Sequence, residues 1–385
     1  MVEGAINALD IGTTEVGRIP ELELVLVDLQ NVDRIRSDAY LTRYAEAIMQ
    51  AERPGDTPLP LDGLDLLMFR LRFDFAHRYG GWVPLIAKNR PITTAEGEIN
   101  GGGKINGGGE INGGGGGPFI LDGCKPLING RKKSGADVTI CVLDTDVYNH
   151  PEFVGRNVEG LAEGAGPEDG PPMAGHGTFG VGLILEQAPA ATIKCRRVLE
   201  PDGGADLWDV ARQIMALESA GELDADILHM PWGCLTRDGK APYLLEATIT
   251  KIARADRVMV AAAGNHGDCV DREVPRNAPC YPAALSRVVS AGAEGPLGEL
   301  TDFTPKPRSA PWIDYAGGGY RVHSTYLRDR CAKWSGTSFS AARYTGLLAA
   351  EKRPGAGPDA RGKSIGEIAR RLAGDWRRRY DEHYG

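Results

Sequence analysis

Residues 138–146 read VTICVLDTD, an apolar stretch that runs into acidic residues. Its length and its β-branched residues favour a buried strand that ends at Asp144. Further apolar stretches follow at 190–198, 227–230, 258–263 and 288–291. Stretches with helical periodicity separate several of them, at 207–219, 243–255 and 339–351. Strands that alternate with helices predict an α/β fold with a mostly parallel sheet, covered by helices on both faces.

Four polar residues stand where such a sheet presents its functional groups. Asp144 ends the first strand, and His176 lies in Gly-His-Gly-Thr before small and apolar residues. Asn265 follows the strand at 258–263, and Ser338 lies in Ser-Gly-Thr-Ser-Phe-Ser at the start of a predicted helix. Functional groups of parallel sheets gather at the carboxyl ends of the strands, so we expect these four side chains to lie together.

These four residue types suit acyl transfer. A serine hydroxyl is a weak nucleophile and needs an adjacent base, which a histidine can supply near neutral pH. A carboxylate on the far ring nitrogen fixes the histidine tautomer and stabilises the imidazolium. An Asn side chain and a backbone N–H at the start of a helix can stabilise the oxyanion of the tetrahedral intermediate.

The order Asp, His, Ser along the chain resembles that of the subtilisin-like serine proteases, the subtilases. The resemblance covers roughly residues 135–352 and includes NHPEF at 149–153, YPA at 281–283 and APWID at 310–314. It implies a three-layer fold with roughly seven strands, and a catalytic triad of Asp144, His176 and Ser338. It also implies an oxyanion hole formed by the Asn265 side chain and the Ser338 backbone N–H.

The same resemblance places an extended substrate as a strand between two segments of the chain. The expected substrate-binding residues are Gly203, Gly204 and Ala205 on one side, and Met230, Trp232 and Gly233 on the other. The family often has Ser-Leu-Gly where this chain has Pro231-Trp232-Gly233. Trp232 either fills a specificity pocket or packs in the core, and the sequence leaves both interpretations open.

Other departures from the family pattern concern charge and metal. Asp146 stands where the family usually has glycine, and it either points to solvent or perturbs the pKa of Asp144 through like-charge repulsion. The connection after His176 is shorter than in secreted subtilisins and lacks the loop of their tight calcium site. A calcium requirement therefore does not carry over, and we expect no metal and no cofactor. His229 and His266 are interpreted as structural.

A glycine-rich stretch separates the chain into parts. Residues 98–117 repeat a hexad, in which a charged residue precedes Ile-Asn-Gly-Gly-Gly, and such a glycine-rich composition resists ordering. We therefore predict a flexible linker at 98–117 between a small α+β domain at 1–97 and a catalytic domain at 118–385. In the first domain, 22–29 predicts a strand and 38–50 a helix, whereas 64–75 is ambiguous. By its position, this domain resembles an inhibitory propeptide.

Composition narrows the partners and the location. The net charge of −8 argues against nucleic acid as a partner, and no apolar run is long enough to span a membrane. No secretion signal is evident, so the expected location is cytoplasmic. The seven cysteines show no paired C-x-x-C spacing, and we expect most of them to be reduced. Cys269 and Cys280 are interpreted as thiols, with a disulfide as the alternative.

The function expected from these observations is an intracellular serine endopeptidase, a zymogen whose N-terminal domain acts as its regulator. Its partners would be a polypeptide substrate and its own N-terminal domain. Two alternatives remain open. One is a maturation protease with narrow specificity for a single partner polypeptide. The other is a silenced protease that serves as a binding protein, motivated by Asp146 and Trp232.

Overall fold

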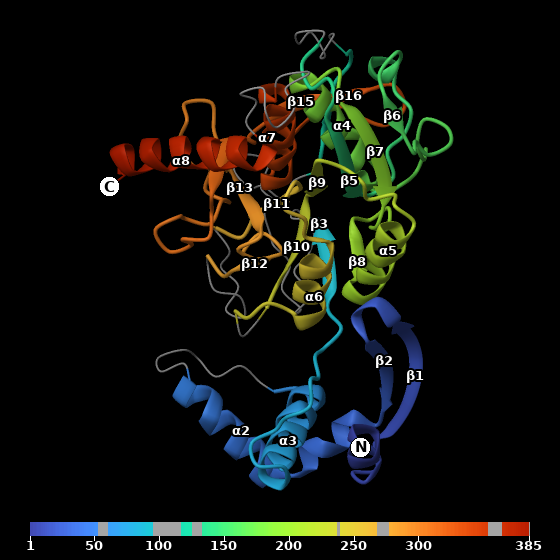
Figure 1. Cartoon of the computed structure of the whole chain (residues 1–385), viewed down its shortest axis with the longest axis vertical. Coiled ribbons are helices and arrows are strands. Elements are labelled where there is room, and N and C mark those ends of the chain that lie inside the picture. The colour runs from blue at the N-terminus through green and yellow to red at the C-terminus, as the bar shows by residue number, and fades with distance from the viewer. Residues whose placement is uncertain are drawn as a thin grey trace. The chain divides into compact units, whose positions relative to one another are not determined.

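The computed structural model describes residues 1–52, 61–94, 117–124, 133–236, 239–267, 277–352 and 364–384 (Figure 1). The chain divides into two compact units, Met1–Asn89 and Arg90–Gly385. The second unit thus begins just before the predicted linker. Most of the linker lies outside the described residues, and the predicted division at 97 and 117 stays a prediction. None of the described helices is both long and apolar enough to cross a membrane.

The first unit combines a hairpin with helices. Its elements are α1 (Val2–Asn7), β1 (Gly12–Ile19), β2 (Leu24–Gln30), α2 (Ala39–Glu52) and α3 (Gly63–Arg78), with short 3₁₀ turns at Pro20–Leu22 and Val32–Ser37. Strands β1 and β2 pair antiparallel. The ambiguous stretch at 64–75 is helical. It is started by a capping box in which Asp62 accepts from the Asp65 N–H at 2.7 Å. Leu66, Leu67 and Leu71 of α3 form the core with Ile11.

The second unit is built on a seven-stranded sheet in which every pair of neighbouring strands is parallel. In spatial order its strands are β14 (Tyr315–Gly318), β13 (Val288–Glu294), β11 (Val258–Ala262), β9 (Ile227–Met230), β5 (Thr139–Asp144), β7 (Thr192–Arg197) and β6 (Val158–Glu159). The residues of β9 and β11 are all buried, which explains their continuous apolar runs. The predicted parallel α/β sheet is confirmed.

Two helix pairs cover this sheet. Helices α4 (His176–Gln187) and α7 (Thr337–Glu351) pack on each other and on the central strands. Helices α5 (Leu207–Ser219) and α6 (Tyr243–Ile252) form the second pair, and α8 (Ile365–Tyr384) packs on α7 and β14. Short 3₁₀ turns at Pro151–Phe153 and Pro172–Gly175 precede β6 and α4. The three-layer architecture brings the starts of α4 and α7 to the carboxyl edge of β5 and β11.

A small antiparallel sheet of four strands lies beside the carboxyl edge of the main sheet. Its order is β12 (Cys280–Tyr281), β10 (Trp232–Leu235), β3 (Pro91–Thr94) and β8 (Gly204–Asp206). Strand β3 belongs to the second unit, although it precedes the glycine-rich stretch in sequence. Figure 1 shows β3 between β10 and β8.

A third sheet, of three strands, includes β16 (Cys331–Trp334), the strand that directly precedes α7. Strand β16 pairs with β15 (Val322–Thr325) and with β4 (Phe119–Ile120). A disulfide joins Cys124 to Cys331 across 207 residues of sequence. Cys141, Cys195, Cys234 and Cys280 are free and buried. Cys280 is therefore a thiol, as expected, whereas the Cys124–Cys331 bond was not anticipated. Cys269 lies outside the described residues.

Candidate active site

Asp144 and His176 form a buried pair. Asp144 is the last residue of β5, His176 is the first of α4, and each side chain is 1% exposed. The Nδ1 atom of His176 lies 2.8 and 3.0 Å from the two carboxylate oxygens. The Thr145 N–H also donates to Asp144 Oδ1, at 2.6 Å. A carboxylate on Nδ1 requires the proton there, so Nε2 carries the lone pair that a base needs.

Small residues let the histidine approach the carboxylate so closely. Gly177 donates its N–H to Thr145 Oγ1 at 3.0 Å. A Cβ on Gly177 would lie 2.7 Å from the Thr145 carbonyl oxygen, and one on Gly175 would lie 2.3 Å from the Tyr326 ring. The two glycines of the Gly-His-Gly segment are therefore required by packing on either side of His176.

Ser338 is the second residue of α7 and is 1% exposed. Phe339, which follows it, packs its ring 5.3 Å from the His176 ring. Trp334 of β16 meets the same imidazole edge-on at 5.8 Å. These contacts bring the start of α7 to the histidine. The backbone N–H groups at a helix start carry partial positive charge, which suits an oxyanion.

Asn265 is tied to the residue before the serine. Its Oδ1 accepts the Thr337 N–H at 2.9 Å, and the Gly264 N–H donates to Thr337 Oγ1 at 3.1 Å. Because Oδ1 accepts from a backbone N–H, the amide orientation is fixed and Nδ2 is the donor atom. The structure therefore brings Asp144, His176, Asn265 and Ser338 to one edge of the sheet. That they act as catalytic residues remains a proposal.

The additional carboxylate of Asp146 has a cationic neighbour. Arg197, the β7 residue in register with Asp144, places its guanidinium 3.8 Å from the Asp146 carboxylate. The Asp146 side chain is 27% exposed, so it is neither fully solvated nor buried. Arg197 also pairs with Glu200. This guanidinium, which sequence reasoning missed, offsets part of the negative charge that Asp146 adds near Asp144.

Two further histidines are fully enclosed near the site. His229 of β9 places Nδ1 3.1 Å from Thr345 Oγ1 of α7, and His266 places Nε2 2.7 Å from the Ala278 carbonyl oxygen. Burial lowers the pKa of both imidazoles to about 4. Both are therefore neutral at neutral pH, in keeping with the structural role expected for them.

The predicted substrate strand position is occupied by the chain itself. Ile92 and Thr93 of β3 lie in register with Ala205 and Gly204, and the Thr94 N–H donates to the Gly203 carbonyl oxygen at 2.8 Å. On the other side, Thr93 and Thr94 pair with Gly233 and Trp232. Sequence reasoning missed this strand. Its signal was a short β-branched run, Pro91-Ile92-Thr93-Thr94, directly before the glycine-rich stretch.

The structure also places the other residues that were expected to bind substrate. Met230 belongs to β9 and is in register with Ala261 of β11, not with β3. The Trp232 backbone pairs with β3, but its side chain is fully buried and donates Nε1–H to the Leu143 carbonyl oxygen at 2.8 Å. Of the two interpretations left open for Trp232, the core role is the one observed.

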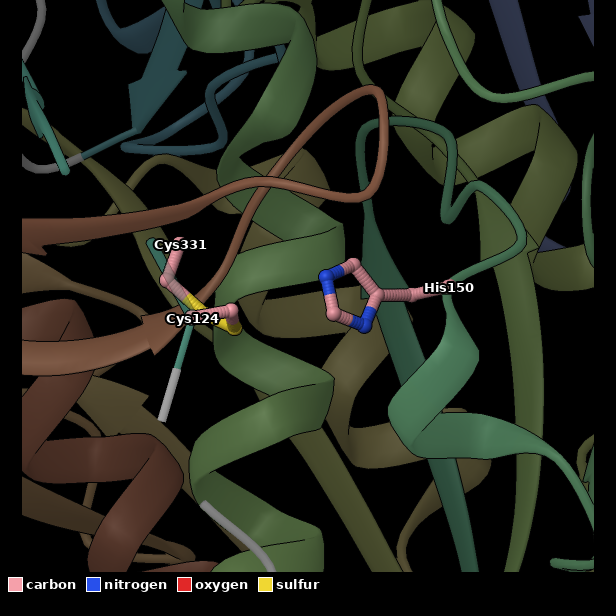
Figure 2. A group of neighbouring side chains, drawn as sticks. All are labelled: Cys124, His150 and Cys331. Atoms are coloured by element: carbon pink, nitrogen blue, oxygen red, sulfur yellow. A yellow bond between two sulfur atoms is a disulfide. The ribbon is translucent and has the colours of Figure 1, made fainter. Parts of the chain in front are cut away.

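One group of three potential metal ligands comes together within the described residues, namely Cys124, His150 and Cys331 (Figure 2). The two sulfur atoms are bonded to each other. The Nε2–H of His150 donates to the Arg330 carbonyl oxygen at 3.0 Å, and Nδ1 accepts the Glu152 N–H at 3.2 Å. Since a metal ligand needs a free lone pair, this arrangement is that of a structural clamp on β16.

Fold and site together define an α/β protein that carries the residues of a serine hydrolase at the carboxyl edge of a parallel sheet. The sequence pattern described as Subtilase family matches residues 135–362, more than half of the chain. The chain belongs to the subtilase family.

The individual relatives of this chain share less than a third of its residues over the matched regions. The chain is 29% identical over 231 residues to the thermostable alkaline protease of Halalkalibacterium halodurans, covering 57% of each chain. It is 26% identical over 241 residues to subtilisin BL of Lederbergia lenta, covering 59% of this chain and 81% of that one. It thus spans little more than half the length of the first relative. Among solved structures, the prenylagaramide maturation protease PagA matches with 25% identity and a TM-score of 0.48, over 57% of this chain and 76% of that one.

Proposed function

We propose that the protein is a serine endopeptidase that hydrolyses peptide bonds through an acyl-enzyme on Ser338. The observation that carries this is the buried Asp144–His176 pair, held at 2.8 and 3.0 Å at the edge where α7 presents Ser338. A histidine with a carboxylate on Nδ1 is arranged to accept a proton at Nε2 and to return it.

We assign the following roles to the four residues. Ser338 Oγ attacks the peptide carbonyl carbon while His176 Nε2 takes its proton. Asn265 Nδ2 and the Ser338 N–H stabilise the oxyanion, and a missing side-chain donor raises such a barrier by about 3–4 kcal/mol. His176 then gives its proton to the leaving amine. A water molecule, deprotonated by the same base, hydrolyses the acyl-enzyme and regenerates Ser338.

The substrate class is an extended polypeptide. Strand β3 supports this, since it adds main-chain pairing to β8 on one side and β10 on the other. Gly203, Gly204 and Ala205 would hold one side of a substrate, and Trp232 and Gly233 the other, by their backbone groups.

We also propose that residues 1–97 form a regulatory domain and that 98–117 form a linker to the catalytic domain at 118–385. The support is that β3, the segment that follows the first compact unit, lies where a substrate would lie. A foreign polypeptide must displace β3, which favours a regulated protease of restricted specificity over a broadly acting one.

The test compares the intact mass of the full chain with that of Ser338→Ala, together with labelling by a fluorophosphonate probe. The active protease is labelled at Ser338. If it processes itself, the wild-type chain is shortened between β3 and residue 118 while the variant stays at full length. The probe is applied both to the wild-type chain and to Ile92→Asp, in which the β3 contacts are weakened. If both proteins are folded and neither is labelled, the enzymatic proposal is contradicted.

A further inference from the structure

Side chains of β3 alternate between the two faces of the small sheet. Thr93 pairs with Gly233, so their side-chain directions share one face. A Cβ on Gly233 would lie 2.6 Å from Cys280 Sγ. The thiol of Cys280 therefore lies on the face to which Thr93 points. A substrate that takes the place of β3 has one residue at the position of Thr93. The substrate residue two positions later points its side chain to the same face of the sheet, where Cys280 lies.

That next position lies beside the oxyanion donor. Strand β3 is antiparallel to β10, so a chain continuing past Thr94 runs beyond Trp232 towards Met230. Met230 is in register with Ala261, and β11 leads from there to Asn265. By this register, the residue after the one in the place of Thr94 faces Pro231. Under the proposed function, its carbonyl group is the one assigned to Asn265. This residue is called the acyl residue below.

Two buried side chains fill the space on this face next to Asn265. Gly264 has a φ of +91°, and a Cβ there would lie 2.7 Å from His266 Nδ1 and 3.3 Å from Cys280 Cβ. His266 and Cys280 are 1% and 4% exposed. The His266 ring is fixed by the 2.7 Å hydrogen bond from Nε2–H to the Ala278 carbonyl oxygen. Neither side chain can move aside without breaking buried packing.

We infer that His266 and Cys280 close the pocket for the acyl residue and restrict the protease to substrates with a small residue there, such as alanine or glycine. The inference rests on the proposed endopeptidase function. The residue that follows Thr94 in this chain is Ala95, which has such a side chain. Overpacking by a large side chain typically reduces the rate by about 10- to 200-fold.

The experiment uses peptidyl diphenyl phosphonates, which bond to an activated serine with loss of phenol. The two reagents carry Ile-Thr-Thr-Ala and Ile-Thr-Thr-Phe, and a plain fluorophosphonate without a peptide reports the activation of Ser338. All three are applied to the full chain with Ile92→Asp, so that β3 does not block the cleft. Labelling is followed by intact mass. We expect the alanine reagent to label at least about tenfold faster than the phenylalanine reagent.

Variants then assign the selectivity to the two residues. Cys280→Gly and, separately, His266→Ala should raise the phenylalanine rate more than the alanine rate, narrowing their ratio about tenfold. Cys141→Ala, which truncates another buried thiol, should leave the ratio unchanged. Equal rates for both reagents in the parent protein would overturn the inference, as would a ratio that neither variant moves. Labelling by the plain probe alone would also overturn it, whereas failure of all three reagents would overturn the proposed function itself.

Discussion

We propose that one amide atom of Asn265 holds the fold and that the other stabilises the oxyanion. Its Oδ1 accepts the Thr337 N–H at 2.9 Å, which leaves Nδ2 as the donor. We predict that Asn265→Ala lowers kcat by about 100- to 1,000-fold with little change in KM, because the lost donor acts on the transition state. Steady-state kinetics on a peptide anilide measures this. Asn265→Asp keeps the acceptor for Thr337 but supplies no donor. A kcat near that of the wild type in either variant would exclude the assigned role.

At the scale of the element, we propose that β3 governs access to the site. Ile92 is fully buried and lies in register with Ala205. A carboxylate at this position would be desolvated without a partner, at a cost of several kcal/mol. We predict that Ile92→Asp weakens the hold of β3 on the cleft and speeds fluorophosphonate labelling of Ser338 by about tenfold or more. Val83→Asp adds the same charge at a residue that is 45% exposed, and it serves as the control. Equal labelling rates in the two variants would show that β3 does not limit access.

A second element, β16, is held by a covalent clamp. The Cys124–Cys331 disulfide closes a loop of 207 residues and secures the strand that carries Trp334 against His176. Loop-closure entropy for this length corresponds to as much as about 5 kcal/mol. We predict that a thiol reductant lowers the denaturant midpoint of the wild type but not that of Cys124→Ser/Cys331→Ser. A wild-type midpoint that is the same with and without reductant would contradict this.

Local elements were predictable where sequence pattern and burial agree. The helix at Leu207–Ser219 and the strand at Ile227–Met230 have the predicted bounds, because each is an uninterrupted periodic or apolar run. The four candidate catalytic positions followed from residues at strand ends and helix starts. The pairing of β3 with β8 and β10, the Cys124–Cys331 bond and the Arg197–Asp146 contact join segments far apart in sequence. No local pattern specifies such partners, so only the fold reveals them.

At the scale of the whole molecule, the enclosed histidines make stability depend on pH. Burial lowers the pKa of His229 and His266 to about 4 in the folded state, whereas the unfolded chain binds these protons near pH 6.5. The unfolded state therefore holds more protons between about pH 6.5 and 4, and stability falls as the pH falls through that window. Each histidine contributes about 3 kcal/mol to this loss.

A comparison of variants separates the contribution of His229 to the pH dependence of stability from that of other titratable groups. Asp314 and Glu294 have pKa values raised by burial, which act in the opposite direction at acidic pH. We predict that His229→Asn, which can still hydrogen-bond to Thr345, flattens the decline of the denaturant midpoint between pH 6.5 and 4. His77→Asn, at an exposed position on α3, should leave the decline as it is. If the wild-type slope persists in His229→Asn, His229 takes up its proton alike in the folded and the unfolded chain, which would contradict its buried, neutral state.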